Sequence, residues 1–303
     1  MSSTMYYKVS KDTVVYAMSA HNKPVVTVDA PARIQFETWD CFSGQIQLDN
    51  AKFDGVDWNC INPATGPVYI NGAEEGDILA VTIDKIETAE AGIVVCGKGV
   101  SVAGDSLQRS IKVVPVKNNT ALFSERLHLP LTKMIGVIGT APKSGEVSCA
   151  TPDMHGGNMD CKEIKEGATL LLPVNVPGAL LAMGDLHAVM ADGEVGGSGL
   201  EISGCITVSV KVIKGITAPL PMLFNNTHVM TIASDEDLDK AVDLAVSNMV
   251  TYLSSAGSFT REEAIMLCSL VADARICQVV DPKKTIRVEL AKKYLPEGLN
   301  LVF

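Results

Sequence analysis

Apolar and polar residues alternate along short segments in the first two-thirds of the chain. In Ile206–Val212 every second residue is apolar, while Thr207, Ser209 and Lys211 lie between them. This period of two is typical of a strand with one buried face. Ile78–Ile86 alternates in the same way, and Gly, Pro, Asn and Asp separate such segments. Many short strands at this spacing predict a mainly-β protein, a jelly-roll-like sandwich or barrel.

The pattern becomes helical in the last third of the chain. Ser234 is a candidate N-cap, and apolar residues recur at helical spacing over Leu238–Leu253. Thr260 and Glu263 have the spacing of a capping box, which predicts a second helix from Glu262 to about Asp273.

Two further strands, Ile276–Val280 and Thr285–Leu290, complete the predicted C-terminal part. We therefore expect a β-sandwich or barrel part over residues 1–215 and a smaller α+β subdomain over residues 216–303. Residues 97–143 have the weakest pattern and could pack with the C-terminal part.

Charge and composition exclude several classes of partner. The 303-residue chain has a formal net charge of -10 and a pI of about 5.0. Binding to phosphate groups or to an anionic membrane requires clustered Lys and Arg, and this acidic balance argues against them, so we expect no nucleic-acid and no membrane partner. No apolar run approaches the roughly 20 residues of a membrane span, and the N-terminus lacks the apolar core of a signal peptide. We expect a cytoplasmic protein.

The eight cysteines are scattered, and none forms a CxxC pair. Their spacing does not match a zinc ribbon. In a chain without an export signal, we expect reduced thiols, several of them packed in the core.

The segment Thr151–Lys162 concentrates groups that bind metals or carry protons. Its candidate side chains are those of Asp153, His155, Asn158 and Asp160. Between them, Gly156-Gly157 allows the backbone to bend sharply and to approach a bound group. A turn with an Asx cap is an equally good interpretation of the same residues.

A second polar cluster lies in Met183–Glu194. If the chain is extended from Asp185 to His187, residues two apart share a face, so these two side chains point the same way. The same reasoning applies to Asp192 and Glu194, and up to four polar groups would gather at one end of a sheet. A solvated hairpin tip is the alternative. The apolar residues between the polar ones argue against full exposure, and buried acids need partners or a metal.

Asp40 is a third candidate, because it lies between aromatic residues after an apolar strand. A paired structural carboxylate would fit the same position. His21, before a proline and a strand, is a weak signal by itself. No GxSxG, HExxH, GxGxxG or P-loop pattern occurs, so the sequence supports neither an α/β-hydrolase serine nor a zincin.

Together these segments resemble the acetamidase/formamidase family, in its shorter, acetamidase-like branch. The resemblance extends from about Ala20 to about Pro282 and rests on seven short motifs in order. The motifs are Phe36–Asp40 with Ser43–Ile46, Asn62–Ile70, Gly72–Asp77, His155–Asp160, Gly184–His187, Asp192–Glu194 and Arg275–Asp281.

This resemblance implies a jelly-roll type of β-sandwich with a smaller α+β part. It also implies hydrolysis of a short amide such as formamide or acetamide to the acid and ammonia. A divalent metal is implied as well, zinc in the first place with calcium as an alternative, together with a homo-oligomer, a dimer or higher.

Amide hydrolysis requires an activated nucleophile, a stabilised oxyanion and a proton for the leaving amine. A divalent metal lowers the pKa of a bound water to about 7, so we expect metal-activated water. The predicted metal ligands are His155, His187, Asp40, Asp160 and His21. The predicted catalytic residues are Glu194, as general base and later acid, with Asp185 and Asp192. The residues predicted to hold the amide are Gly156, Gly157 and Asn158.

Two other functions fit parts of the sequence. A thiol-dependent amidase would use Cys161 or Cys41 as its nucleophile, activated by a nearby cation. A non-enzymatic jelly-roll binding module would hold calcium in its Asp-rich loops, although two histidines there argue against calcium.

Overall fold

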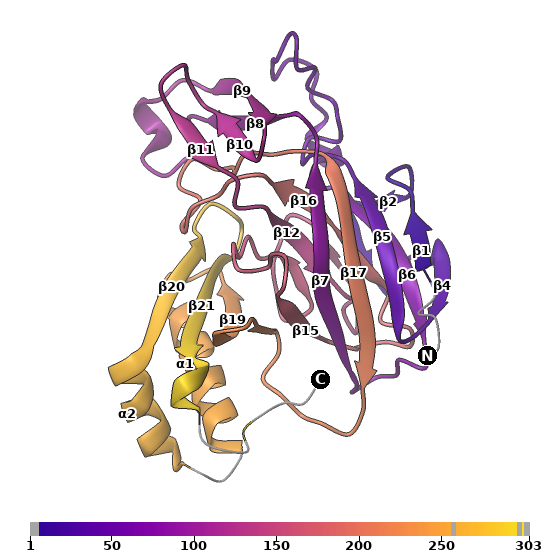
Figure 1. Ribbon diagram of the computed structural model, residues 1–303, viewed down its shortest axis with the longest axis vertical. Helices are drawn as coiled ribbons and strands as arrows, with labels where there is room; N and C mark the ends of the chain where they lie inside the picture. Colours follow the sequence, from indigo (N-terminus) through magenta and orange to yellow (C-terminus); the bar gives the residue numbers. More distant parts are fainter. Residues whose placement is uncertain (1–5, 256–258, 296–298, 300–303) are drawn as a thin grey trace.

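Four β-sheets and two α-helices make up the described part of the chain (Figure 1). The computed structural model describes residues 6–255, 259–295 and 299. The predicted class, a mainly-β fold with a smaller C-terminal α+β part, is confirmed. No described helix is both long enough and apolar enough to cross a membrane.

The largest sheet of the described chain has nine strands. Its strands, in spatial order, are β1 (Tyr6–Val9), β5 (Ala32–Thr38), β17 (Gly204–Ile213), β7 (Ile78–Thr88), β15 (Thr169–Pro173), β18 (Met222–Phe224), β19 (His228–Asp235), β21 (Lys284–Ala291) and β20 (Ala272–Gln278). Only β1 and β5 pair in parallel among these described strands. The sheet contains strands from both sides of the boundary that we predict between residues 215 and 216, and that division stays a prediction.

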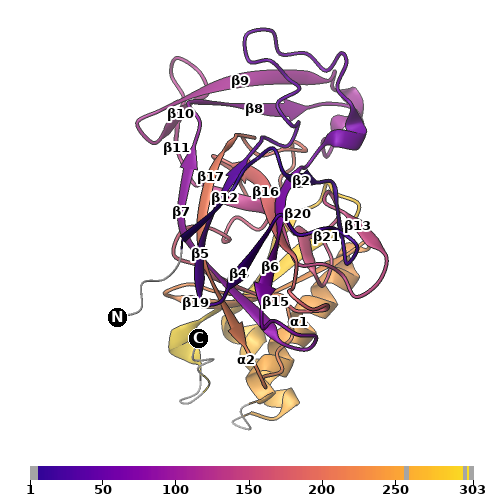
Figure 2. The ribbon, with the colours of Figure 1, turned by 90° about the vertical axis from the view of Figure 1, so that its right-hand side faces the viewer.

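A six-stranded sheet faces the first part of the nine-stranded sheet (Figures 1 and 2). Its strands are β14 (Gly156–Asn158), β12 (Met134–Gly139), β16 (Leu181–His187), β6 (Ala64–Asn71), β2 (Val14–Val15) and β4 (Val26–Asp29). One continuous apolar cluster fills the space between the two sheets, with residues such as Ile34, Val81 and Ile135. Ile206 and Val208 are fully buried in it, as the period of two predicts.

A four-stranded sheet stands at one end of the sandwich, at the top of Figure 2. Its strands are β8 (Ala91–Cys96), β9 (Ser110–Lys117), β10 (Thr120–Leu122) and β11 (His128–Pro130). A two-stranded sheet, β3 (Ala17–Ser19) with β13 (Glu146–Ser148), completes the β-structure of the described residues. Three short 3-10 helices cover Trp58–Cys60, Gly104–Ser106 and Lys292–Tyr294.

The two helices, α1 (Leu238–Ser255) and α2 (Arg261–Val271), pack beside the C-terminal strands. The predicted capping box of α2 is confirmed, because Thr260 Oγ1 accepts from Glu263 N–H and Glu263 Oε2 accepts from Thr260 N–H. The helix ends before Asp273, however, because β20 begins at Ala272.

The predicted N-cap of α1 is wrong. Ser234 belongs to β19 and hydrogen-bonds through its hydroxyl to Thr285 of β21, so it is not available to a helix. The carboxylate of Asp237 instead accepts from the backbone N–H groups of Asp239 and Lys240. The helix therefore begins later than the sequence pattern suggested.

The capping box predicts a measurable stability difference. We expect Thr260→Ala to lower the free energy of unfolding by about 1 kcal/mol. The N–H of Glu263 loses its acceptor, and the Glu263 carboxylate that accepts from the N–H of residue 260 is held less firmly in place. Thr260→Ser keeps the hydroxyl and serves as the control. Guanidinium unfolding of the two variants measures the difference, and equal stabilities would contradict a capping role.

Candidate active site

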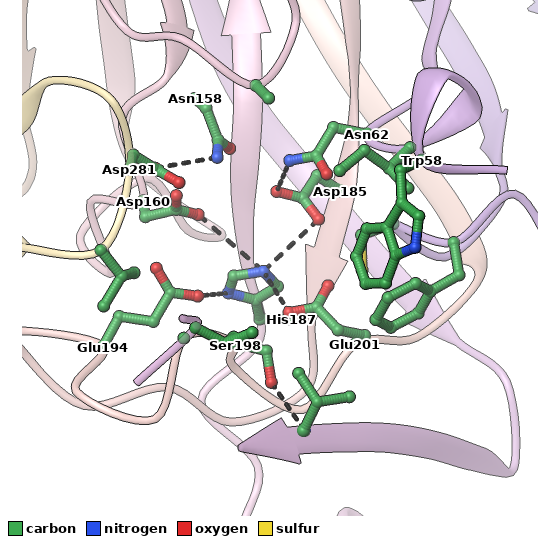
Figure 3. A pocket seen from close by; sticks show the side chains of 18 of the residues that line it. Trp58, Asn62, Asn158, Asp160, Asp185, His187, Glu194, Ser198, Glu201 and Asp281 are labelled. Carbon is green, nitrogen blue, oxygen red and sulfur yellow. Dashed lines mark hydrogen bonds and ion pairs between the residues drawn. The ribbon is translucent and has the colours of Figure 1, made fainter. Parts of the chain in front are cut away.

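A cavity of about 190 Å³ opens where β16 ends. Five carboxyl groups, four of them buried, and one imidazole point into it from different parts of the chain (Figure 3). These residues are Asp160, Asp185, His187, Glu194, Glu201 and Asp281. The cavity therefore brings together titratable groups that lie far apart in the sequence.

Strand β16 supplies Asp185 and His187, and its seven residues are all buried between β12 and β6. The opposite strand carries Gly136, where a Cβ atom would lie 2.5 Å from both Asp160 Oδ1 and Asp185 Oδ2. Only glycine leaves room for two carboxylates at this point. Gly136 is thus part of the construction of the site, although it contributes no functional group.

Backbone strain is concentrated around the cavity. Asn62, Asp160, Asp185 and Glu194 line it and have φ values of 51°, 42°, 55° and 45°. Non-glycine residues rarely adopt this left-handed conformation, and Glu is less suited to it than Asn or Asp. Such strain persists where the surrounding structure enforces it, which is common at functional sites.

His187 lies at the centre of the acidic group. Its Nε2 atom is 3.1 Å from Glu201 Oε1, 3.5 Å from Asp185 Oδ1 and 3.8 Å from Asp160 Oδ1. Its Nδ1 atom is 4.0 Å from Glu194 Oε1. Burial alone would lower the pKa of His187, but the carboxylates of Glu201 and Asp185 outweigh it and raise the pKa well above its usual value.

The cavity carries far more acidic than basic groups. None of the described residues that line it is Lys or Arg. Burial raises the pKa of Asp160 to about 6 and that of Glu201 to about 8, with the charge of Asp185 adding to both. Asp160 Oδ1, Asp185 Oδ1 and Glu201 Oε2 have no hydrogen-bond partner among the described groups.

These properties fit a divalent cation. Two groups of three side chains offer ligand atoms that all lie within 4.8 Å of one another. The groups are Asp160, His187 and Glu194, and Cys41, Asp185 and Glu201. Imidazole and carboxylate are zinc ligands, and buried carboxylates without partners are costly unless a cation neutralises them.

An aromatic wall faces the acidic groups. Phe42, Phe53 and Trp58 line the cavity, with Trp58 stacked on Phe53 at 6.0 Å and edge-on to Phe42 at 6.5 Å between ring centroids. Asp40 shapes the turn that carries Phe42, since its Oδ1 accepts from the backbone N–H groups of Phe42 and Gly44. Asp40 is not among the residues that line the cavity.

Of the predicted metal ligands, the cavity contains His187 and Asp160 but not His155, His21 or Asp40. His155 is buried elsewhere, and burial lowers its pKa to about 4. His21 is exposed in a turn. His155 precedes β14, at the opposite end of this short strand from Asn158, and His21 follows the end of β3.

Of the three residues predicted to hold the amide, one lines the cavity and two do not. Asn158 lines the cavity, and its Nδ2 donates to Asp281 Oδ2 at 2.9 Å while its Oδ1 has no partner among the described atoms. Gly156 and Gly157 lie in β14, where a Cβ would come within 2.4 Å of a neighbouring carbonyl oxygen at both positions. These glycines serve close strand packing, and they do not line the cavity.

Asp192 and Glu194 do not point the same way, contrary to the sequence interpretation. Arg287, which is buried, donates to both carboxylate oxygens of Asp192 at 2.6 Å and 2.8 Å, and Lys162 Nζ lies 2.9 Å from Oδ2. Gly193 N–H donates to Cys277 O. The turn that follows directs Glu194 into the cavity, so Asp192 anchors the loop and is not in contact with the site.

The two candidate thiols have different surroundings. Cys41 lines the cavity, where burial and the nearby Glu201 and Asp185 raise the pKa of the thiol well above its usual value. Such surroundings keep a thiol protonated and unreactive. Cys161 is fully buried outside the cavity, and although burial opposes ionisation, Cys277 and Arg287 lower the pKa of this thiol.

The sequence interpretation missed Glu201, Asp281 and Asn62 as site residues. Asn62 Nδ2 donates to Asp185 Oδ2 at 3.4 Å. Glu201 exchanges backbone hydrogen bonds with Ile93 of β8, which holds it beside His187. The available signals were weak: Asn62 and Asp281 belong to two of the motifs, and Glu201 is a single acid between Leu200 and Ile202.

Comparison with known proteins identifies close relatives. The model of the acetamidase/formamidase family matches residues 17–148 and 144–291. A predicted acetamidase/formamidase from Thermoanaerobacter tengcongensis has 47% sequence identity and a TM-score of 0.94, covering 97% of this chain and 98% of that chain. An acetamidase from Bacillus halodurans has 43% identity and a TM-score of 0.92, covering 95% and 98%.

A more distant relative is a protein of Schizosaccharomyces pombe that carries the name formamidase. It is 27% identical over 260 residues, which cover 65% of this chain. The matched region spans 63% of the length of that relative.

The anchor of the Asp192 loop generates a prediction about stability. We expect Arg287→Met to lower the free energy of unfolding by roughly 3–5 kcal/mol, because it leaves partly buried carboxylates without their partner. Lys162 is a second partner of Asp192, and its own side chain is 33% exposed. Lys162→Met should therefore cost at most about 1 kcal/mol. Guanidinium unfolding measures both, and equal losses would contradict the anchoring role of Arg287.

Proposed function

Because this chain belongs to the acetamidase/formamidase family, we propose that it hydrolyses short linear amides to a carboxylate and ammonia in the acidic cavity. The observation that carries the proposal is the position of five carboxyl groups, four of them buried, and of His187 opposite an aromatic wall. An amide offers a polar head to the acidic groups and an apolar acyl part to the rings. Formamide and acetamide are the simplest substrates of this kind.

We propose that a divalent cation, zinc in the first place with calcium as the alternative, belongs in this cavity. Asp160, His187 and Glu194 would hold it, since their ligand atoms converge and the cavity has no basic side chain among its described residues. When bound, such a cation polarises a carbonyl oxygen and lowers the pKa of water. Asp160 and Glu194 would then act as ligands, so the base predicted from the sequence, Glu194, has a different proposed role.

Glu201 is the carboxylate that we assign to proton transfer. It lies on the side of His187 that faces the aromatic wall, where the acyl part of an amide would pack (Figure 3). Its Oε2 has no protein partner among the described groups, so it can accept a proton from the attacking water. The same carboxyl group can deliver that proton to the leaving nitrogen, and the products are then the carboxylate and ammonia.

The remaining polar groups would orient the substrate and the proton carriers. Asp185 lies 3.5 Å from His187 Nε2 and accepts from Asn62, so it fixes the imidazole ring. Asn158 presents a free carbonyl oxygen, which is suited to accept from the NH₂ group of the amide. Asp192 would act indirectly, by holding the loop that carries Glu194.

The first test is ammonia release from formamide and acetamide by protein of known metal content. We expect activity to disappear after chelation and to return with zinc, in proportion to the ion bound. Metal-free protein that keeps its activity would contradict the role of the cation and favour a thiol, which iodoacetamide would then block. Ion-loaded protein that releases no ammonia from either amide would contradict the proposed activity and favour a binding module.

A pair of variants separates proton transfer from cation binding. Glu201→Gln should lower kcat by roughly 10²–10⁴-fold while the protein keeps its ion, because the amide cannot accept the proton. Asp160→Asn should lower the bound ion itself, measured by elemental analysis. Glu166→Gln, whose side chain is 43% exposed, is the control for both. Normal kcat in Glu201→Gln would contradict the assignment.

A further inference from the structure

The acidic groups occupy one side of the cavity, and the other side is apolar. Three aliphatic side chains continue the aromatic wall there, those of Ile61, Val95 and Val100. Together with Phe42 and Phe53 they belong to one apolar cluster. Formamide and acetamide place at most one methyl group against this surface. The cavity therefore offers more apolar contact than these two amides use.

The volume of the cavity indicates a larger acyl group. An apolar protein cavity of about 150 Å³ holds a benzene molecule, and this cavity measures about 190 Å³. It thus has room for a carboxamide that carries one ring. A methyl group in the same place would leave most of the wall without contact partners and forfeit their dispersion energy.

The aromatic wall presents ring faces and ring edges to a guest molecule. Trp58 is stacked on Phe53 with 25° between the ring planes, and it meets Phe42 edge-on at 83°. Aromatic pairs favour these stacked and edge-to-face arrangements. A flat ring in the cavity can make both kinds of contact, whereas an aliphatic chain can make neither.

Hydrogen bonds hold the loop that carries this wall. Gln45 Oε1 accepts from the backbone N–H of Asp57 at 2.7 Å, and Gln45 Nε2 donates to Asp57 O at 3.3 Å. At the end of the loop, Ile61 lines the wall and the adjacent Asn62 donates to Asp185. The wall is therefore fixed relative to the acidic groups, and little of it has to be ordered when a substrate binds.

The wall lies directly beside the acidic groups. Glu201 is on the side of His187 that faces the rings (Figure 3). A ring bonded directly to the carbonyl carbon can therefore contact the wall while the carbonyl stays at the acidic groups. None of the described lining residues is Lys or Arg, so an acyl part with its own carboxylate would be repelled. The arrangement fits a neutral ring.

We propose that the apolar side of the cavity is a subsite for the ring of an arenecarboxamide, with benzamide as the simplest substrate. This inference rests on the proposed amide hydrolysis. Water adds its hydroxyl to the carbonyl carbon and a proton to the nitrogen as the C–N bond breaks, so the products are benzoic acid, which ionises, and ammonia. Trp58 is the most exposed ring of the wall, at 44%, so it bounds the subsite on its solvent side and determines the preference for a ring.

Ammonia release from benzamide and acetamide by zinc-loaded protein is the first measurement. Burial of the ring should make kcat/KM for benzamide about tenfold higher than that for acetamide, or more. Acetamide as an equal or better substrate would overturn the ring subsite and leave the proposed amidase activity intact. No ammonia from benzamide, acetamide or formamide would contradict the amidase activity itself, and this inference with it.

Variants of Trp58 test its role in the preference. Trp58→Ala should lower the ratio of kcat/KM for benzamide to that for acetamide about tenfold, and Trp58→Phe, which keeps a ring, should restore most of it. Phe123→Ala is the matched control, because Phe123 is 38% exposed and does not line the cavity. Circular dichroism checks the fold of each variant. An unchanged ratio in Trp58→Ala would overturn the assignment of Trp58.

Binding of the ring can be measured without turnover, because the chain has two tryptophans. In a Trp39→Phe/Glu201→Gln double variant only Trp58 remains, and benzamide should change its fluorescence until the site is saturated. The matched Trp58→Phe/Glu201→Gln variant keeps only Trp39, which does not line the cavity, and should not respond. Equal responses of the two variants, or no response of either, would contradict a ring beside Trp58 whether or not the protein is an amidase.

Discussion

Five carboxyl groups surround one imidazole in a cavity to which the described chain contributes no lysine or arginine. Removing a carboxylate from water costs several kcal/mol unless a counter-charge replaces the lost hydration. Burial raises the pKa of Asp160 and Glu201 for this reason. A bound cation would reverse this effect and satisfy oxygen atoms that have no partner in the protein. The free-energy cost of burying these charges explains why the surrounding backbone and packing hold the carboxyl groups in one arrangement.

The specialisation is visible in the backbone. Glu194 adopts a left-handed conformation that is unfavourable for its residue type, and it is held there because Arg287 fixes Asp192 two residues earlier. Gly136 leaves the space in which Asp160 and Asp185 approach each other. Both features stabilise one arrangement of the acidic groups against their mutual repulsion. A rigid sandwich core, fully buried between two sheets, provides the support on which this strain depends.

The sequence predicted the parts of the protein that depend on local periodicity. Alternation over Ile78–Ile86 and Ile206–Val212 identified β7 and β17, and the Thr260–Glu263 spacing identified the start of α2. The N-cap prediction for Ser234 was wrong because Thr285, which pairs with it across the sheet, lies far away in the sequence. The local chemistry of Met183–Glu194 correctly singled out Asp185, His187 and Glu194 as residues of one cluster. Asp192 has the same composition around it, and only the position of Arg287 turns it away.

Glu201 illustrates the limit of motif reasoning. Nothing in its immediate neighbours distinguishes it from a surface acid, and it reaches His187 only because the Ser198–Glu201 segment pairs with β8. Asp281 likewise enters the cavity from the loop that joins β20 and β21. That loop makes the C-terminal hairpin a structural part of the site, because the same hairpin supplies Arg287 and the Cys277 carbonyl that accepts from Gly193. The geometry of the cavity therefore depends on β20 and β21 as well as on the sandwich, since this hairpin positions both Asp281 and the loop that carries Glu194.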